Sequence, residues 1–105
     1  MAFKVRFAPK AQTDIQEFAT YLAAYSEIVA DRYITELATA IERHILPRPT
    51  SWQFFFLTGA PYRAYLFKIS RRTAYWIIYE IDDSVETVNI LRFWHAARDP
   101  EAFIV

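Results

Sequence analysis

Along residues 3–8, apolar and basic residues alternate one by one. This two-residue period, built from phenylalanine and valine against lysine and arginine, predicts a β-strand. Pro9 follows directly. Because proline cannot donate to a strand ladder but fits the first turn of a helix, we expect the strand to end here and a helix to begin.

Downstream of this strand, apolar residues recur every three or four positions as far as Tyr25, and the same spacing resumes after Ser26 and continues to Ile45. Such spacing is typical of amphipathic helices. Asp14 suits the positive end of the first helix dipole. Ser26 can cap the second helix with its side chain, and Pro47 stops that helix. The two runs are therefore predicted to form a helical hairpin.

Three further strands are predicted over residues 61–69, 74–82 and 86–94, because β-favouring residues dominate each run and short polar turns separate the runs. Connections this short imply an antiparallel meander. In the last run, strict alternation would place on one face Val88, Ile90, Arg92 and Trp94.

Both faces of these strands are apolar, whereas an antiparallel sheet with one wet face alternates between apolar and polar residues. The helical hairpin can cover only one face. The other face requires the aromatic segment 50–60, the tail 103–105 or a second protein. Segment 50–60 is predicted to be a loop, and its distinctive residues are Trp52, Phe54, Phe55, Phe56 and the only glycine, Gly59. It either folds back onto the core or presents aromatic anchors to a partner.

The composition restricts the class of protein. The chain has 105 residues, of which 54% are hydrophobic, and it contains no cysteine. This length suits a single domain over residues 1–105, and the apolar content excludes a disordered linker. The lack of cysteine excludes a disulfide framework and a thiolate metal site. With no leader-like start and no apolar run near the ~20 residues that cross a bilayer, we expect a cytoplasmic protein without a membrane partner.

The formal net charge is zero, but the charges are unevenly distributed. Residues 43–79 hold six basic residues and no acidic residue, whereas the segments before and after have net charges of −2 and −4. The basic stretch either forms a surface that meets an anionic partner, or is a solvated face whose acidic complements come from elsewhere in the fold.

No recognised cofactor or metal motif is present. A single glycine excludes both the Walker loop and the dinucleotide fingerprint, and two distant histidines without an acidic motif do not support a metal site. We therefore expect no cofactor and no metal. The remaining candidate chemistry is basic and aromatic.

Metal-free phosphodiester cleavage needs a proton acceptor, a proton donor and cations near the phosphorus oxygens. The candidate catalytic residues are Arg63, Lys68, His95 and Arg98. The candidate residues for binding a partner are Arg63, Lys68, Arg71, Arg72, Tyr79, Arg92, Arg98, Trp52 and Phe54. Each also has a structural interpretation, such as core packing for a tyrosine on an apolar strand or a solvated turn for an arginine pair.

Several segments, in the same order, carry a resemblance to a known family: Val5-Arg6-Phe7-Ala8-Pro9-Lys10-Ala11, Ala30-Asp31-Arg32-Tyr33, Tyr62-Arg63, Tyr75-Trp76-Ile77-Ile78-Tyr79-Glu80-Ile81-Asp82 and Ile90-Leu91-Arg92-Phe93-Trp94-His95-Ala96-Ala97-Arg98-Asp99-Pro100. Together they resemble the RelE/ParE toxin superfamily of bacterial type II toxin–antitoxin systems, often labelled plasmid stabilisation proteins. The resemblance implies an α+β fold of order β-α-α-β-β-β, with the helical hairpin packed on a small, mostly antiparallel sheet. It also implies a cognate antitoxin that wraps the toxin.

The resemblance implies two activities. RelE-like members cut messenger RNA on the ribosome, whereas ParE-like members bind DNA gyrase. Nucleolytic relatives have an arginine directly after the first tyrosine of the central strand, and this chain has Trp76 there. They also have two lysines on the preceding strand, and in this chain only Lys68 corresponds to one of them. We therefore expect a ParE-like, target-binding growth inhibitor. The alternatives are a non-toxic interaction module and a ribosome-dependent endoribonuclease that uses Arg63, Lys68, Arg98 and His95.

Overall fold

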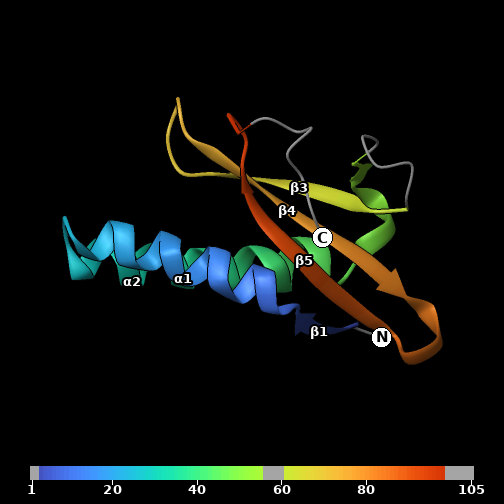
Figure 1. The fold of residues 1–105 in the computed structure, drawn as a ribbon. Helices are drawn as coiled ribbons and strands as arrows, with labels where there is room; N and C mark the ends of the chain where they lie inside the picture. Colours follow the sequence, from blue (N-terminus) through green and yellow to red (C-terminus); the bar gives the residue numbers. More distant parts are fainter. Residues whose placement is uncertain (1–2, 56–60, 99–105) are drawn as a thin grey trace.

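A computed structural model describes residues 3–55 and 61–98 of the chain. Two helices pack on one face of a mixed sheet, which confirms the predicted α+β fold (Figure 1). In chain order the main elements are β1 (Lys4–Phe7), α1 (Pro9–Ala23), α2 (Glu27–Ala40), β2 (Gln53–Phe54), β3 (Arg63–Lys68), β4 (Ala74–Asp82) and β5 (Thr87–His95).

Within the described residues the sheet has five strands in the order β1-β5-β4-β3-β2. β1 pairs in parallel with β5, and the other neighbours pair antiparallel. The predicted meander of the last three strands is therefore confirmed. The sequence predicts a loop throughout 50–60, but this segment contributes the short strand β2, because its backbone pairs with the start of β3. Phe56, Gly59 and the tail 103–105 lie outside the described residues.

The helical hairpin follows its local sequence signals. α1 begins at Pro9, in the position where a missing N–H costs nothing. Ser26 caps α2 as predicted, because its hydroxyl oxygen accepts a hydrogen bond from the Val29 N–H at 3.2 Å. α2 continues into a π-helical turn over Ile41–Ile45, and both isoleucines of this turn are buried.

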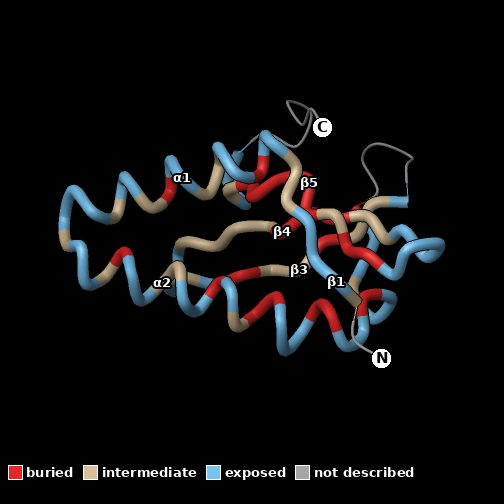
Figure 2. The backbone as a smooth tube through the Cα atoms, turned by 90° about the horizontal axis from the view of Figure 1, so that it is seen from below, coloured by how far each residue is buried: buried red, intermediate tan, exposed pale blue. Residues whose placement is uncertain are grey.

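The larger hydrophobic core lies between the helices and the sheet. α1 and α2 lie side by side and turn their buried residues towards the strands (Figure 2). The core members from the hairpin and its π-helical turn are Ala11, Phe18, Leu37, Ala40, Ile41 and Ile45, and those from the strands are Phe67, Ile77, Tyr79, Val88, Ile90 and Phe93. Each large apolar side chain buried here stabilises the fold by about 1.5–3 kcal/mol.

One extra residue in β5 interrupts the alternation of its side chains. Ile78 of β4 pairs with Arg92, and the next residue of β4, Tyr79, pairs with Ile90. Leu91 has no partner on β4 and is therefore a β-bulge. A shift of one residue exchanges the two faces of a strand. Ile90 therefore packs against the helices, whereas Trp94 packs on the opposite face. The predicted common face for the alternating residues of β5 is wrong for this reason.

The face away from the helices is covered in part by the chain itself. A second buried cluster on this face consists of Phe55, Ala64, Ile78 and Trp94. Phe55 belongs to the aromatic segment, and its N–H donates to the Tyr62 carbonyl at 2.7 Å. Its neighbour Phe54 is 49% exposed. Among the described aromatic residues of the segment, Phe55 is buried and Trp52 packs against the larger core, whereas Phe54 stays accessible.

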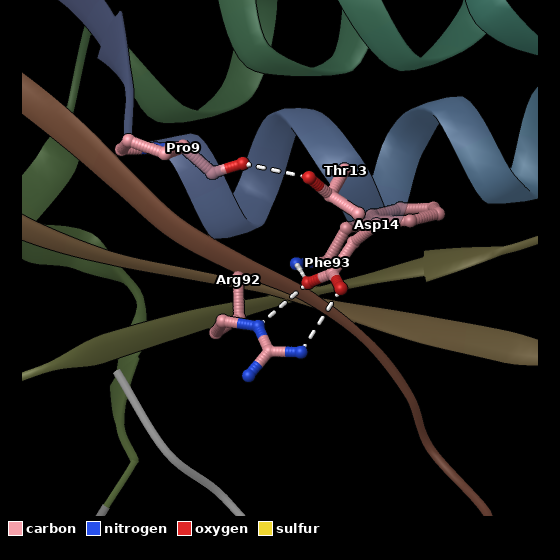
Figure 3. Close-up of polar contacts among 5 residues, drawn as sticks. All are labelled: Pro9, Thr13, Asp14, Arg92 and Phe93. Carbon is pink, nitrogen blue, oxygen red and sulfur yellow. Dashed lines mark hydrogen bonds and ion pairs between the residues drawn. The ribbon is translucent and has the colours of Figure 1, made fainter.

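Asp14 joins α1 to the edge of β5 (Figure 3). β1 pairs only with the first part of β5. The N–H of Phe93 therefore has no strand partner on this edge and is bonded by a side chain of α1 instead. Asp14 Oδ2 accepts hydrogen bonds from the Phe93 N–H at 3.0 Å and from Arg92 Nε at 2.7 Å, while Oδ1 accepts from Arg92 Nη2 at 2.9 Å. The two charged side chains are only 10% and 11% exposed. Hydrogen bonding to Asp14 raises the pKa of Arg92, so the arginine stays charged.

Replacing Asp14 should strongly destabilise the protein. Asp14→Ala leaves the Arg92 guanidinium buried without its carboxylate and is expected to lower the free energy of unfolding by about 3–5 kcal/mol. Urea denaturation followed by circular dichroism measures this loss. Glu36→Ala is the matched control, because it removes the exposed Arg32–Glu36 pair at 3.8 Å and should cost less than ~1 kcal/mol. Equal losses in the two variants would contradict the role given to Asp14.

Candidate functional site

Four candidate residues line one groove at the end of the β3–β4 hairpin. The groove has a volume of about 660 Å³, and its basic and titratable residues are Lys68, Arg71, Arg72 and His95. We call it the basic groove. Its apolar lining comes from Leu66, Ile69 and three alanines. The hairpin tip extends beyond the rest of the sheet, near the end of β5 (Figure 1).

The turn between β3 and β4 brings the three cations together. Lys68 closes β3 opposite Ala74, the first residue of β4. Two backbone N–H groups of the turn donate to the Thr73 carbonyl, at 2.9 and 3.1 Å. The turn is therefore tight, and it leaves Arg71 and Arg72 exposed at its tip.

The basic groove contains no acidic side chain. Its lining has no carboxylate, and within residues 3–55 and 61–98 no carboxylate oxygen lies within 4.0 Å of the charged groups of Lys68, Arg71 or Arg72. Cations that gather without counter-charges create a positive potential that attracts an anionic partner. Part of the acid-free stretch 43–79 therefore gathers three cations around one groove.

His95 is held beside the turn by the backbone of β5. The Ala96 N–H donates to the Ala74 carbonyl at 2.8 Å, which continues the pairing of β5 past its last residue. The imidazole Nδ1 accepts a hydrogen bond from the Ala97 N–H at 3.0 Å. In the neutral ring the proton is then on Nε2, so the free nitrogen is a hydrogen-bond donor. In this tautomer the hydrogen-bonding group of the ring that the Ala97 contact leaves available is the Nε2 N–H, which is a donor.

Arg63 lies at the opposite end of β3, about 17 Å from Lys68 by the rise of an extended strand. Its Nη1 donates to the Trp52 carbonyl at 2.7 Å, and its guanidinium carbon lies 4.0 Å from the centre of the Phe54 ring. The indole of Trp52 in turn donates to the His44 carbonyl at 2.6 Å. Three candidates thus form a second cluster outside the basic groove, but Trp52 of this cluster and Lys68 of the groove both line a neighbouring hollow of about 730 Å³.

The remaining arginine candidates flank the indole of Trp94. The guanidinium carbon of Arg98 lies 4.1 Å from its ring centre, and that of Arg92 lies 5.0 Å away. Arg98 is exposed and lines a smaller pocket of about 210 Å³ that shares His95 with the basic groove. Arg92 is 8% exposed and bound to Asp14, so its charge serves the fold. Of these two guanidinium groups, only that of Arg98 belongs to an exposed residue.

Tyr79 is fully buried on the helix side of β4. Its hydroxyl donates to the Pro49 carbonyl at 2.6 Å, and burial raises the pKa of the phenol well above its usual value. Its ring is therefore part of the core, which agrees with its structural interpretation, and is not accessible for stacking on a base.

The sequence patterns missed the pairing of Asp14 with Arg92. Asp14 lies between Ala11 and Phe18 on the apolar stripe of α1, and both of these neighbours are buried. A carboxylate inside a buried stripe requires a buried partner. This position was the signal that could have identified Arg92 as a structural residue.

Two further observations concern the described residues alone. In residues 3–55 and 61–98, no group of three or more His, Asp and Glu side chains is placed to hold a metal ion. In the same part of the chain, no helix combines the length and the hydropathy needed to cross a membrane.

The sequence matches, over residues 5–100, the family model for the ParE toxin of type II toxin–antitoxin systems, parDE. No curated protein matches the chain. Among solved structures, the fold is similar to a chain of the toxin–antitoxin complex RelBE2 from Mycobacterium tuberculosis, with a TM-score of 0.58 and 22% sequence identity. The similarity covers 90% of this chain and 99% of that one. At this level of identity, the likeness shows a common fold.

Tyr79→Phe tests the structural role of the tyrosine. Removing the hydroxyl leaves the buried Pro49 carbonyl without its donor and should lower the free energy of unfolding by about 1–3 kcal/mol. Thermal or urea denaturation measures the change. Tyr25→Phe, at a tyrosine that is 77% exposed, is the control and should leave stability unchanged. If Tyr79→Phe is as stable as the parent protein, the hydrogen bond to Pro49 does not contribute.

Proposed function

The chain belongs to the ParE toxin family of type II toxin–antitoxin systems, and on that premise we propose that it arrests growth by binding a cellular target. The target implied by the family resemblance is DNA gyrase in the cytoplasm. A cognate antitoxin neutralises the toxin by binding it. A similar fold occurs in the RelBE2 complex, which consists of a toxin with its antitoxin.

The basic groove is the observation that carries this proposal. Lys68, Arg71 and Arg72 are exposed on one turn, and no carboxylate lines the groove beside them. Exposed cations of this kind recognise a partner by long-range attraction and by direct contact. Binding in this way requires neither a metal nor a proton acceptor.

The same site supports endonuclease chemistry less well. Cleavage without metal needs a group that takes a proton from the attacking hydroxyl. His95 has its Nδ1 occupied by the Ala97 N–H, and Tyr79 is buried with its hydroxyl bound to Pro49. Arg63 and Arg98 can stabilise negative charge, but an arginine side chain has no hydrogen-bond acceptor and does not serve as a base. In addition, Arg63 lies in the second cluster, with Trp52.

Two assays with the purified chain separate the possible activities. In a supercoiling assay with DNA gyrase, we expect inhibition that increases with toxin concentration. In a translating ribosome extract, we expect messenger RNA to remain intact. Codon-linked cleavage would instead support a RelE-like endoribonuclease, and inactivity in both assays would support a non-toxic interaction module. Either of these two results contradicts the proposal.

Charge removal at the hairpin tip should weaken the toxin. Arg71→Ala/Arg72→Ala removes two exposed cations and is expected to raise the concentration needed for half-maximal gyrase inhibition about tenfold or more, since ~1.4 kcal/mol of lost attraction is a factor of ten. The control, Arg43→Ala/Arg48→Ala, removes two exposed arginines of the same acid-free stretch outside the groove and should have little effect. Added salt should reduce the difference between the variants.

An equal loss in both double variants would show that total charge, and not the basic groove, determines inhibition. Circular dichroism and thermal denaturation of each variant confirm that the fold is retained. Neither pair of arginines makes an ion pair with a described residue, so neither substitution should affect stability.

A further inference from the structure

Exposed apolar residues gather at the end of the helical hairpin. Within residues 3–55 and 61–98, six large hydrophobic residues are exposed, and three of them are close together in the sequence: Tyr21 at 62%, Tyr25 at 77% and Ile28 at 82%. The other three lie on three separate elements. Figures 1 and 2 both show this end of the helices extending beyond the strands. We call the three residues the tyrosine patch.

Local contacts hold the tyrosine patch in place. Tyr21 and Tyr25 are four residues apart, and their rings meet edge to face with centres 5.4 Å apart. The N–H groups of Tyr25 and Ser26 donate to the Leu22 carbonyl at 3.0 and 2.9 Å, which fixes the connection between α1 and α2. Hydrogen bonding to Tyr25 raises the pKa of Tyr21, so this phenol is uncharged at neutral pH. The patch is therefore ordered before a partner binds, which lowers the entropic cost of binding.

The surroundings of the tyrosine patch are acidic. Residues 11–31 contain four carboxylates and no lysine, arginine or histidine. Asp14 is paired inside the fold, but Glu17, Glu27 and Asp31 are exposed and make no ion pair with a described residue. Glu27 and Asp31 line a hollow of about 330 Å³ between α1 and α2. A surface of this kind repels phosphate groups and attracts cations.

The pocket of about 210 Å³ continues this surface along α1. Glu17 and Tyr21, about one helical turn apart, line it together with Tyr75 of β4. His95 and Arg98 line it from the end of β5, and the Arg98 guanidinium carbon lies 4.1 Å from the centre of an indole ring that packs on the other face of the sheet. The charge on the α1 side of the pocket is therefore negative. A carboxylate beside aromatic rings binds an ammonium or guanidinium group by ion pairing and by cation–π attraction.

We propose that the tyrosine patch binds a basic amphipathic segment of a partner protein. Apolar side chains of that segment pack on Tyr21, Tyr25 and Ile28. Its arginine or lysine side chains pair with the exposed carboxylates on either side of the patch, Glu17 on α1 and Asp31 on α2. The patch and the basic groove share no residue, so this surface is additional to the one that the proposed function uses.

Other occupants fit the tyrosine patch less well. A nucleic acid or an anionic lipid surface would bring phosphates against the carboxylates. A second copy of the chain, docked by the same patch around a two-fold axis, would place two sets of carboxylates against each other. An acidic partner that suits the basic groove would be repelled here for the same reason. A basic protein segment satisfies both the apolar residues and the charges.

A synthetic peptide tests the tyrosine patch without a natural partner. The probe is an amphipathic helix of about 14 residues, with leucine every three or four positions and arginine on both sides of the leucine stripe. It is added to the full-length chain, and the amide shifts of the chain are followed by NMR. We expect saturable shifts at residues 17–31 and none at the β3–β4 turn. A peptide in which glutamate replaces every arginine is the matched control and should leave these amides unchanged.

Variants of the tyrosine patch test the apolar contact. Tyr25→Ser/Ile28→Ser should raise the Kd of the arginine peptide about tenfold or more, because exposed apolar anchors carry much of the binding free energy. The control, Val5→Ser/Val85→Ser, changes two exposed apolar residues elsewhere and should leave the Kd unchanged. Circular dichroism and thermal denaturation check that each variant keeps the fold. An unchanged Kd in Tyr25→Ser/Ile28→Ser contradicts the inference.

Single charge variants test the ion pairing. Glu17→Gln should raise the Kd of the arginine peptide about threefold, whereas Glu42→Gln, at an exposed carboxylate outside the patch, should not. Further results overturn the inference: no saturable shifts at residues 17–31, equal binding of the glutamate peptide, larger shifts there with a DNA oligonucleotide, or shifts that depend on chain concentration without peptide, which indicate a second copy. None of these measurements uses gyrase, messenger RNA or growth arrest, so failure of the inference is distinguishable from failure of the proposed function.

Discussion

The ion pair between Asp14 and Arg92 is the interaction on which the rest of the structure depends. β1 is too short to cover the whole of β5, and a carboxylate from α1 takes over where β1 ends. The same carboxylate reaches Arg92, whose side chain comes from the opposite face of the sheet. One buried acid therefore sets the position of the helix and closes the sheet edge. Each charge needs the other, because an isolated charge at so buried a position costs several kcal/mol.

Contacts lead from this pair to the basic groove. The guanidinium groups of Arg92 and Arg98 both lie against the Trp94 ring. Trp94 is in turn paired with Trp76 of the neighbouring strand β4. The end of β5, and with it His95, is thus fixed by packed side chains. Arg71 and Arg72 lie outside this frame on a tight turn. A rigid scaffold that presents exposed charges on a turn is suited to recognition by contact.

Elements that depend on local signals could be predicted from the sequence, since Ser26 caps its helix and alternation along β3 and β4 matches their faces. Features that depend on distant residues could not. Asp14 and Arg92 are 78 positions apart, and nothing local pairs them. Nor could the sequence show which basic residues of the acid-free stretch 43–79 lie together in space. Lys68, Arg71 and Arg72 lie close together because they belong to one tight turn and the strand end beside it. Arg63 lies far from them because it is at the other end of the extended strand β3.

The bulge at Leu91 also limits how the chain can vary in length. Deleting Leu91 alone would remove the bulge and leave Ile90 and Arg92 on the faces that they now occupy, whereas deleting a residue from a regular part of β5 would exchange the faces of the residues beyond the deletion. An insertion in the β3–β4 turn would only lengthen an exposed loop. Related sequences that keep this architecture should therefore keep the lengths of the regular parts of β5, while the hairpin tip is free to lengthen and to acquire different partner specificity.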